Sequence, residues 1–64
     1  MKVKYVSGIR FKDGEAMFFT WDTIEELENH IEEMKESIEK VYLKIKFTFS
    51  EGNHDLEILY ADNN

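Results

Sequence analysis

Polar and apolar residues alternate along the first twelve positions of the chain. The apolar positions include Val3, Tyr5, Ile9 and Phe11, and lysine or arginine residues stand between them. A period of two is typical of a strand with one buried and one solvated face. The pattern therefore predicts a β-strand that begins the fold and directs these four side chains into a core.

Asp13-Gly14 follows this strand and predicts a tight hairpin. Aspartate followed by glycine is a strong signal for a two-residue type I′ turn. We therefore expect Glu15 to Trp21 to return antiparallel to the first strand. In the register of a two-residue turn, Ile9 lies opposite Phe18.

Gly8 interrupts the first strand and falls opposite Phe19 in the same register. A glycine inside a strand typically marks a bulge, or a gap over which an aromatic ring lies. A bulge at this position would exchange which of Phe18, Phe19 and Trp21 face the core, and the pattern leaves that choice open.

A helix is predicted directly after the hairpin. Asp22 or Thr23 can cap it, and a glutamate stands three residues after each, as in a capping box. Steps of three and four residues then connect the apolar positions, which makes one hydrophobic stripe. Its members are Ile24, Leu27, Ile31, Met34 and Ile38.

The segment from Val41 to Phe49 shows the cleanest alternation in the chain. Its apolar residues are expected to point one way, and they are Val41, Leu43, Ile45, Phe47 and Phe49. Gly52-Asn53 marks a second turn, and the last strand is expected to turn Leu56, Ile58 and Tyr60 inward. Leu59 makes this strand apolar on its other face as well, as in central or covered strands.

These elements predict an α+β fold in one domain, residues 1–64. The order is ββαββ, with one helix packed on a four-stranded, mostly antiparallel sheet. The expected core comprises Val3, Tyr5, Ile9, Phe11, Phe18, Leu27, Ile31, Met34, Leu43, Ile45, Phe47, Leu56 and Ile58.

In length and element order the chain resembles the β-grasp fold of ubiquitin-like and small immunoglobulin-binding domains. The resemblance implies that the two terminal strands pair in parallel at the centre of the sheet. Modifiers and sulfur carriers of that fold end in Gly-Gly, whereas this chain ends in Asp62-Asn63-Asn64. We therefore expect neither conjugation nor sulfur transfer, and the lack of cysteine excludes the ferredoxin branch.

Composition restricts the setting in which this chain works. It has no cysteine, so neither disulfides nor thiolate metal sites can stabilise it. No apolar run approaches the length of a membrane span, and no signal-peptide core follows Met1. The sequence predicts a cytoplasmic protein whose net charge of −6 favours solubility.

Catalytic chemistry has few candidates in this sequence. Only His30 and His54 are histidines, the residue type that titrates near neutral pH without a large pKa shift. Glu26 and Glu33 flank His30 by one helical turn, a line that could hold a divalent cation weakly, but a solvated boundary histidine is the explanation that we favour. We expect no enzyme activity, no cofactor and no metal site.

Acidic residues gather in the predicted helix, where eight acids and one base lie between Asp22 and Glu39. Helical spacing would align five of them as a row of negative charge, namely Glu25, Glu28, Glu32, Glu36 and Glu39. A solvated face kept for solubility is one explanation. The functional hypothesis is a protein partner with a basic surface, for which the helix imitates nucleic acid. Small inhibitors or adaptors of bacteria and phages have this character.

Two alternatives use the sheet. Its face opposite the core is expected to carry an aromatic and cationic set that fits single-stranded nucleic acid, with Phe19, Trp21, Tyr42, Lys44 and Lys46 as the contacts. The net charge of −6 opposes this, because nucleic-acid affinity depends on phosphate neutralisation. The apolar segment Ala16–Trp21, as an edge strand, offers a second copy a place to pair, so the domain could also be a purely structural homodimer.

Overall fold

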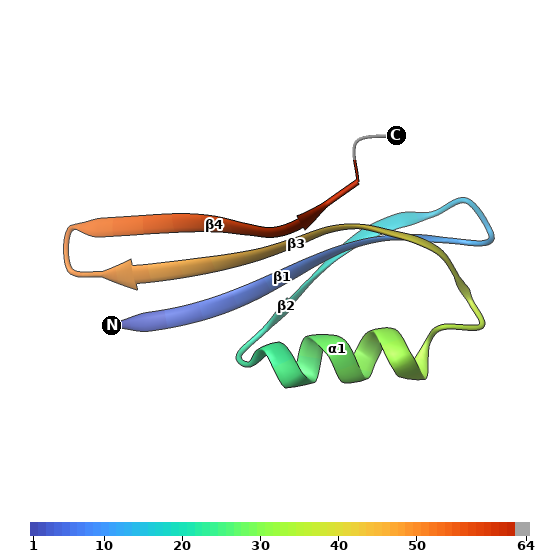
Figure 1. The fold of residues 1–64 in the computed structure, drawn as a ribbon, viewed down its shortest axis with the longest axis horizontal. Coiled ribbons are helices and arrows are strands. Elements are labelled where there is room, and N and C mark those ends of the chain that lie inside the picture. The colour runs from blue at the N-terminus through green and yellow to red at the C-terminus, as the bar shows by residue number, and fades with distance from the viewer. Residues whose placement is uncertain (63–64) are drawn as a thin grey trace.

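The computed structural model describes residues 1–62, and Figure 1 shows five elements in the predicted order. They are β1 (Lys2–Phe11), β2 (Ala16–Trp21), α1 (Ile24–Glu33), β3 (Ile38–Ser50) and β4 (Asn53–Ala61). The ββαββ order and the α+β class predicted from the hydrophobic pattern are confirmed.

The four strands form one open sheet in the order β2-β1-β3-β4. Every neighbouring pair is antiparallel. In the β-grasp arrangement the terminal strands pair in parallel, whereas here β1 pairs with β3 and β4 lies at the edge. The resemblance to that fold therefore stops at the order of elements along the chain.

The first hairpin has a three-residue turn instead of the predicted two-residue turn. The Phe11 N–H donates to the carbonyl of Glu15 at 2.8 Å, and Gly14 N–H donates to Phe11 at 2.9 Å. Gly14 has a φ of 97°, as in a type I turn closed by a left-handed residue. One added turn residue moves every β2 side chain to the other face of the sheet.

The observed β2 register follows from that turn. Gly8 lies opposite Phe18, and Ser7 lies opposite Phe19. The prediction that paired Ile9 with Phe18 and Gly8 with Phe19 is therefore wrong by one residue. An aromatic ring does lie over Gly8, as the glycine suggested, but it belongs to Phe18.

Three irregularities interrupt the pairing of β3 with its two neighbours. Between Arg10 and Phe11 the β3 partner changes from Lys40 to Ile38, which leaves Glu39 as an extra residue. Between Gly8 and Ile9 the β3 partner changes from Leu43 to Val41, which leaves Tyr42 as an extra residue. Between Lys44 and Ile45 the β4 partner changes from Tyr60 to Ile58, which leaves Leu59 extra. Each bulge moves the side chains beyond it to the other face.

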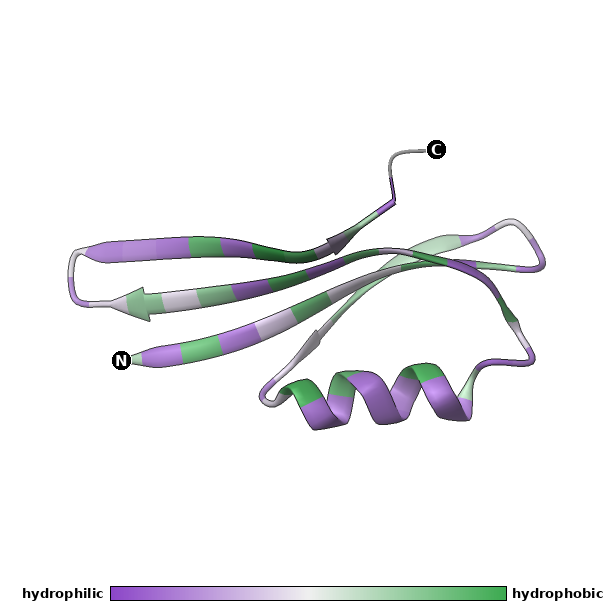
Figure 2. Cartoon of the chain, in the orientation of Figure 1, coloured by the Kyte–Doolittle hydropathy of each residue, from purple (hydrophilic) through white to green (hydrophobic). Residues whose placement is uncertain are grey.

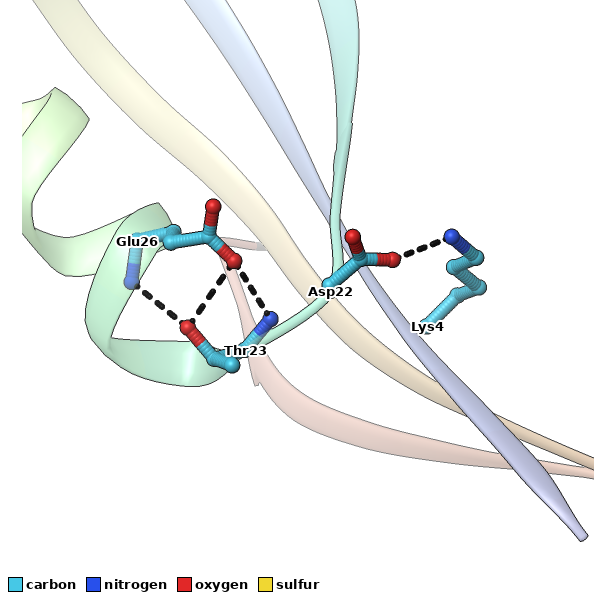
Figure 3. Close-up of polar contacts among 4 residues, drawn as sticks. All are labelled: Lys4, Asp22, Thr23 and Glu26. Atoms are coloured by element: carbon cyan, nitrogen blue, oxygen red, sulfur yellow. Dashed lines mark hydrogen bonds and ion pairs between the residues drawn. The ribbon is translucent and has the colours of Figure 1, made fainter.

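α1 begins at a capping box. The Thr23 hydroxyl accepts from the Glu26 N–H at 3.1 Å, and the Glu26 carboxylate accepts from the Thr23 N–H at 3.1 Å (Figure 3). Figure 2 shows the apolar stripe of α1 turned toward the strands and its polar side turned away. The helix contacts β1 and β2.

The helix is shorter than its apolar stripe predicted. α1 ends at Glu33, Met34 caps it, and Ile38 already belongs to β3, where it pairs with Phe11. The Lys12 N–H also donates to the Ser37 carbonyl at 2.9 Å. Because it pairs with β1, Ile38, the last residue of the predicted helical stripe, lies in a strand.

The fully buried residues lie where α1 meets β1. Ile9 and Leu27 are completely buried, and so is the polar Ser7. The Ser7 hydroxyl accepts a hydrogen bond from Trp21 Nε1 at 3.2 Å. This bond satisfies an indole that the sequence had not placed in the core, because the three-residue turn brings it there.

Much of the predicted core does not lie under the helix. Val3, Tyr5, Phe11 and Ile31 are half-buried on the helix side, and Met34 is exposed. The other members lie on the opposite face or point to solvent there, because the turn and the bulges reverse their orientation. They are Phe18, Leu43, Ile45, Phe47, Leu56 and Ile58.

The molecule is elongated, with principal extents of 40 × 24 × 16 Å. In Figure 1 the β3–β4 turn and the start of β1 project well past the N-terminal end of α1. The strand β4 lies at the sheet edge far from the helix. One short helix therefore covers one end of one face. Within residues 1–62, no helix packs on the rest of the sheet.

Candidate functional site

The five glutamates predicted as a partner-binding row do not lie on one helix. Glu25, Glu28 and Glu32 are in α1, whereas Glu36 is in the following turn and Glu39 is in β3. The ten residues of α1 rise about 15 Å. The helical row therefore comprises three glutamates, and Glu36 and Glu39 are not part of it.

Two of the three helical glutamates hold lysines of the same chain. Glu28 accepts from Lys44 Nζ at 2.8 Å, and Glu32 accepts from Lys35 Nζ at 3.0 Å. The glutamate side chains keep 51% and 73% of their exposure, so these pairs contribute little stability. Both carboxylates remain accessible to a partner, but each already has a cation beside it.

The aromatic and cationic set predicted for nucleic acid is divided between the two faces of the sheet. Phe19 and Trp21 lie beneath α1, with ring centroids 4.6 and 4.8 Å from the His30 ring. Lys44 lies on the helix side, where it forms an ion pair with Glu28 of α1. Lys46 follows two residues later on the same face. Tyr42 packs on Gly8 and Phe18 on the opposite face. The five residues Phe19, Trp21, Tyr42, Lys44 and Lys46 therefore do not form one surface.

The His30 side chain packs against aromatic rings beneath α1. Its ring contacts Phe19 and Trp21, and its buried Nδ1 has no hydrogen-bond partner among the described residues. A shallow hollow beside it is lined by Trp21, Glu26, Asn29 and Glu33. Within residues 1–62, no group of three His, Cys, Asp or Glu residues is arranged to hold a metal ion.

The most distinctive surface is the sheet face opposite α1, here called the uncovered face. Cross-strand pairing assembles its apolar centre, because residues directly opposite each other share a face. Val6 pairs with Ile45, and Ile45 pairs with Ile58. Phe47 pairs with Leu56 in the next row. Its apolar members are Val6, Phe18, Leu43, Ile45, Phe47, Phe49, Leu56 and Ile58.

These side chains are strongly exposed for apolar residues. Phe18 is 63% exposed, Ile58 60%, Leu56 46% and Phe49 40%. No element within residues 1–62 packs over them, because α1 lies on the other side of the sheet. A contiguous apolar patch rimmed by polar residues is typical of an interaction surface.

Cations border the uncovered face at both ends. Lys2 and Lys4 pair with Phe49 and Phe47 at one end. Arg10 pairs with Lys40 at the other end, where Lys40 holds Asp62 at 3.2 Å. Among the paired strand positions described on this face, none is Asp or Glu. The face is therefore apolar in the middle and bordered by cations, of which Lys4 holds Asp22 and Lys40 holds Asp62, while the glutamates of α1 lie on the other side.

The sequence contained one signal for this surface. A strand rises about 3.3 Å per residue and a helix about 1.5 Å. A ten-residue helix cannot cover a thirteen-residue strand along its length. The alternation in β3 identified the apolar side chains, but the bulge at Tyr42 leaves Val41 on the helix side opposite Ile9 and turns the apolar residues from Leu43 to Phe49 away from α1.

The strand β2 is an edge strand, as the pairing hypothesis for Ala16–Trp21 requires. Within residues 1–62, α1 is too short and too polar to cross a bilayer. Comparisons with protein-family models, with curated proteins and with solved structures found no match to this chain. The function proposed below therefore rests on the chain's own geometry.

Proposed function

We propose that this protein is a non-catalytic protein-interaction module, and that the uncovered face is its binding surface. The observation that carries the proposal is the exposure of Phe18, Ile58, Leu56 and Phe49 on one continuous apolar face. Burying apolar surface is favourable by roughly 25 cal/mol per Å². A face of this composition gains most from a protein surface of similar character.

Single-stranded nucleic acid is a weaker candidate for this face. The Phe47 and Phe49 rings stack on each other, 5.8 Å apart and 12° from parallel. Phe18 and Tyr42 pack over Gly8. The rings of this face therefore pack on one another, the side chains between them are aliphatic and give a base no ring to stack on, and a net charge of −6 opposes phosphate binding.

Site-specific photocrosslinking tests the proposal. A photoreactive phenylalanine analogue replaces Phe18, which is 63% exposed on the uncovered face. The matched control replaces Tyr60, which is 45% exposed and pairs with Lys44 on the helix side. After irradiation in a lysate of the source cells, protein adducts are expected from position 18 and not from position 60. Adducts only with nucleic acid, or equal adducts at both positions, would contradict the proposal.

The acidic side supports a second candidate function, that of a stoichiometric inhibitor or adaptor for a protein with a basic surface. Glu28 and Glu32 keep half or more of their exposure, and α1 lies on the face opposite the uncovered one. Both surfaces can therefore be occupied at the same time. If this candidate is correct, the tagged protein should capture protein partners from a lysate of the source cells. That capture should resist nuclease, and it should weaken with salt because exposed charge pairs are screened.

Reversing Glu25, Glu32 and Glu36 to lysine tests this second candidate. These positions are exposed, so the fold is expected to survive the reversals. The matched control reverses Asp55, Glu51 and Glu57, which are also exposed and lie in the β3–β4 hairpin. Loss of capture only in the first variant supports the acidic helix as the contact, and equal capture by both variants refutes it.

A further inference from the structure

The isolated chain leaves more surface exposed than its mass predicts. A monomeric globular protein of 7.7 kDa exposes about 4,300 Å², whereas this chain exposes 4738 Å². Its radius of gyration is 12.6 Å, against about 11 Å for a compact domain of the same length. The β3–β4 hairpin projects past α1 (Figure 1), and its apolar pairs Ile45–Ile58 and Phe47–Leu56 belong to the uncovered face.

We propose that the occupant of the uncovered face is a second copy of this chain, packed face to face about a two-fold axis that runs along β3. This inference rests on the proposed function, because it names the protein that the face binds. The assembly would have two sheets in the middle and one helix on each outer side, as in a β-sandwich covered by helices.

The thin core argues for a second copy in preference to an unrelated partner. Only Ile9 and Leu27 are buried apolar residues within the described chain, and there is no cysteine to add a disulfide. Chains near this length bury little surface alone, and oligomerisation is one of the usual remedies. A second copy is the one partner always present at the concentration of the chain itself.

The arrangement of the strands makes the uncovered face self-complementary. A two-fold interface brings the same patch of both copies together. With the axis along β3, the apolar row from Leu43 to Phe49 lies at the centre. β1 of one copy then lies over β4 of the other, because β1 and β4 flank β3. Apolar residues of β4 therefore meet Val6 of the other copy.

The same axis keeps the basic residues apart. Lys2 and Lys4 of the two copies are offset sideways by two strand spacings, about 10 Å, and by the further 10 Å or so between packed sheets. That separation exceeds the Debye length of about 8 Å at physiological salt. The glutamates of α1 lie farther away still, on the outer sides.

The available area suits a stable interface. The molecule is 40 Å long and four strands at about 4.8 Å spacing are about 19 Å wide, dimensions close to the roughly 800 Å² per partner of a standard protein interface. Because the contact is mainly apolar, association should hold or strengthen when sodium sulfate is added. Binding through the glutamates should weaken with salt, so salt separates the two modes.

Sedimentation equilibrium of the purified full chain tests the inference. We expect a mass of twice 7.7 kDa at about 100 μM. Ile58→Lys places a charge in the interface and should raise the dimer dissociation constant by at least about 100-fold. The matched control is Glu57→Lys, which adds positive charge one residue away on the other face and should leave the dimer intact.

Chemical crosslinking tests the same contact without disturbing it with a charge. The chain has no cysteine, so Ile45→Cys introduces one thiol near the proposed axis. A bis-maleimide that spans the roughly 10 Å between packed sheets should join two copies. Lys44→Cys, one residue away on the helix side, should not crosslink.

Three results would overturn the inference. They are a 7.7 kDa monomer at all concentrations, a dimer that survives Ile58→Lys, and equal crosslinking from positions 44 and 45. A surviving dimer would point to the edge strand Ala16–Trp21 instead. If the chain is monomeric but position 18 still gives adducts with other proteins, the proposed function stands and only the identity of the partner is wrong.

Discussion

Gly8 and Phe18 lie directly opposite each other in β1 and β2, and the Phe18 ring covers the glycine. A methyl group at Gly8 would come within 3.1 Å of Phe18, 3.0 Å of the Tyr42 ring and 3.2 Å of Leu43 Cβ. The glycine is therefore required by packing on the uncovered face. Two aromatic rings and a strand approach its backbone more closely than a β-carbon allows.

Gly8→Ala should destabilise the protein by about 1–3 kcal/mol, because an overpacked site forces its neighbours to shift. Urea denaturation followed by circular dichroism measures the loss. Phe18→Ala in the same chain provides the control, since removing the ring relieves one of the clashes. The explanation fails if the alanine costs the same in the presence and absence of the Phe18 ring.

Leu27→Ala should cost about 2–5 kcal/mol, since Leu27 is completely buried between α1 and the sheet. Met34→Ala is the matched control, because Met34 is 37% exposed at the end of the helix and should cost much less. Thermal and urea denaturation of both variants give the comparison. Similar losses at the two positions would show that α1 does not pack through Leu27.

Thr23→Ala should cost about 1 kcal/mol, because it removes the hydroxyl that accepts the Glu26 N–H at the start of α1 (Figure 3). Thr23→Ser keeps the hydroxyl and should restore most of that stability. The free energies of unfolding of both variants test the cap. A serine variant as unstable as the alanine variant would assign the effect to the lost methyl group.

Lys4 and Asp22 supply a pH dependence. The hydrogen bond from Lys4 Nζ, together with its charge, holds the pKa of the Asp22 carboxyl below its usual range (Figure 3). A carboxyl with a lowered pKa in the folded state stabilises the protein above its unfolded pKa, about 3.9. That contribution is lost as the pH falls through the lower, folded value.

In Lys4→Met, NMR titration should show that the pKa of Asp22 has risen toward its usual range. Stability above about pH 4 should fall slightly, and the difference from wild type should vanish in stronger acid. Lys2→Met is the control, since Lys2 contributes least to the shift. An unchanged Asp22 titration in Lys4→Met would refute the ion pair.

The local sequence determined the elements and most of their boundaries. Alternation placed β1 and β3, Thr23 and Glu26 specified the start of α1, and the lack of a long apolar run matched the absence of a membrane-spanning helix within residues 1–62. These features depend on neighbouring residues, on side-chain period and on capping, and such interactions act within one or two turns of chain.

The alternation of β1 predicted its inward side correctly, whereas tertiary structure decided which side of β2, β3 and β4 faces the helix. Asp13-Gly14 suits both a two-residue and a three-residue turn, and the observed choice reversed Phe18 and Trp21. Extra residues at Tyr42 and Leu59 reversed the strands beyond them. A period of two defines the two faces of a strand but does not say which face is inside. That is decided when distant strands pair, and it placed the apolar face of β3 on the outside, where the proposed interface lies.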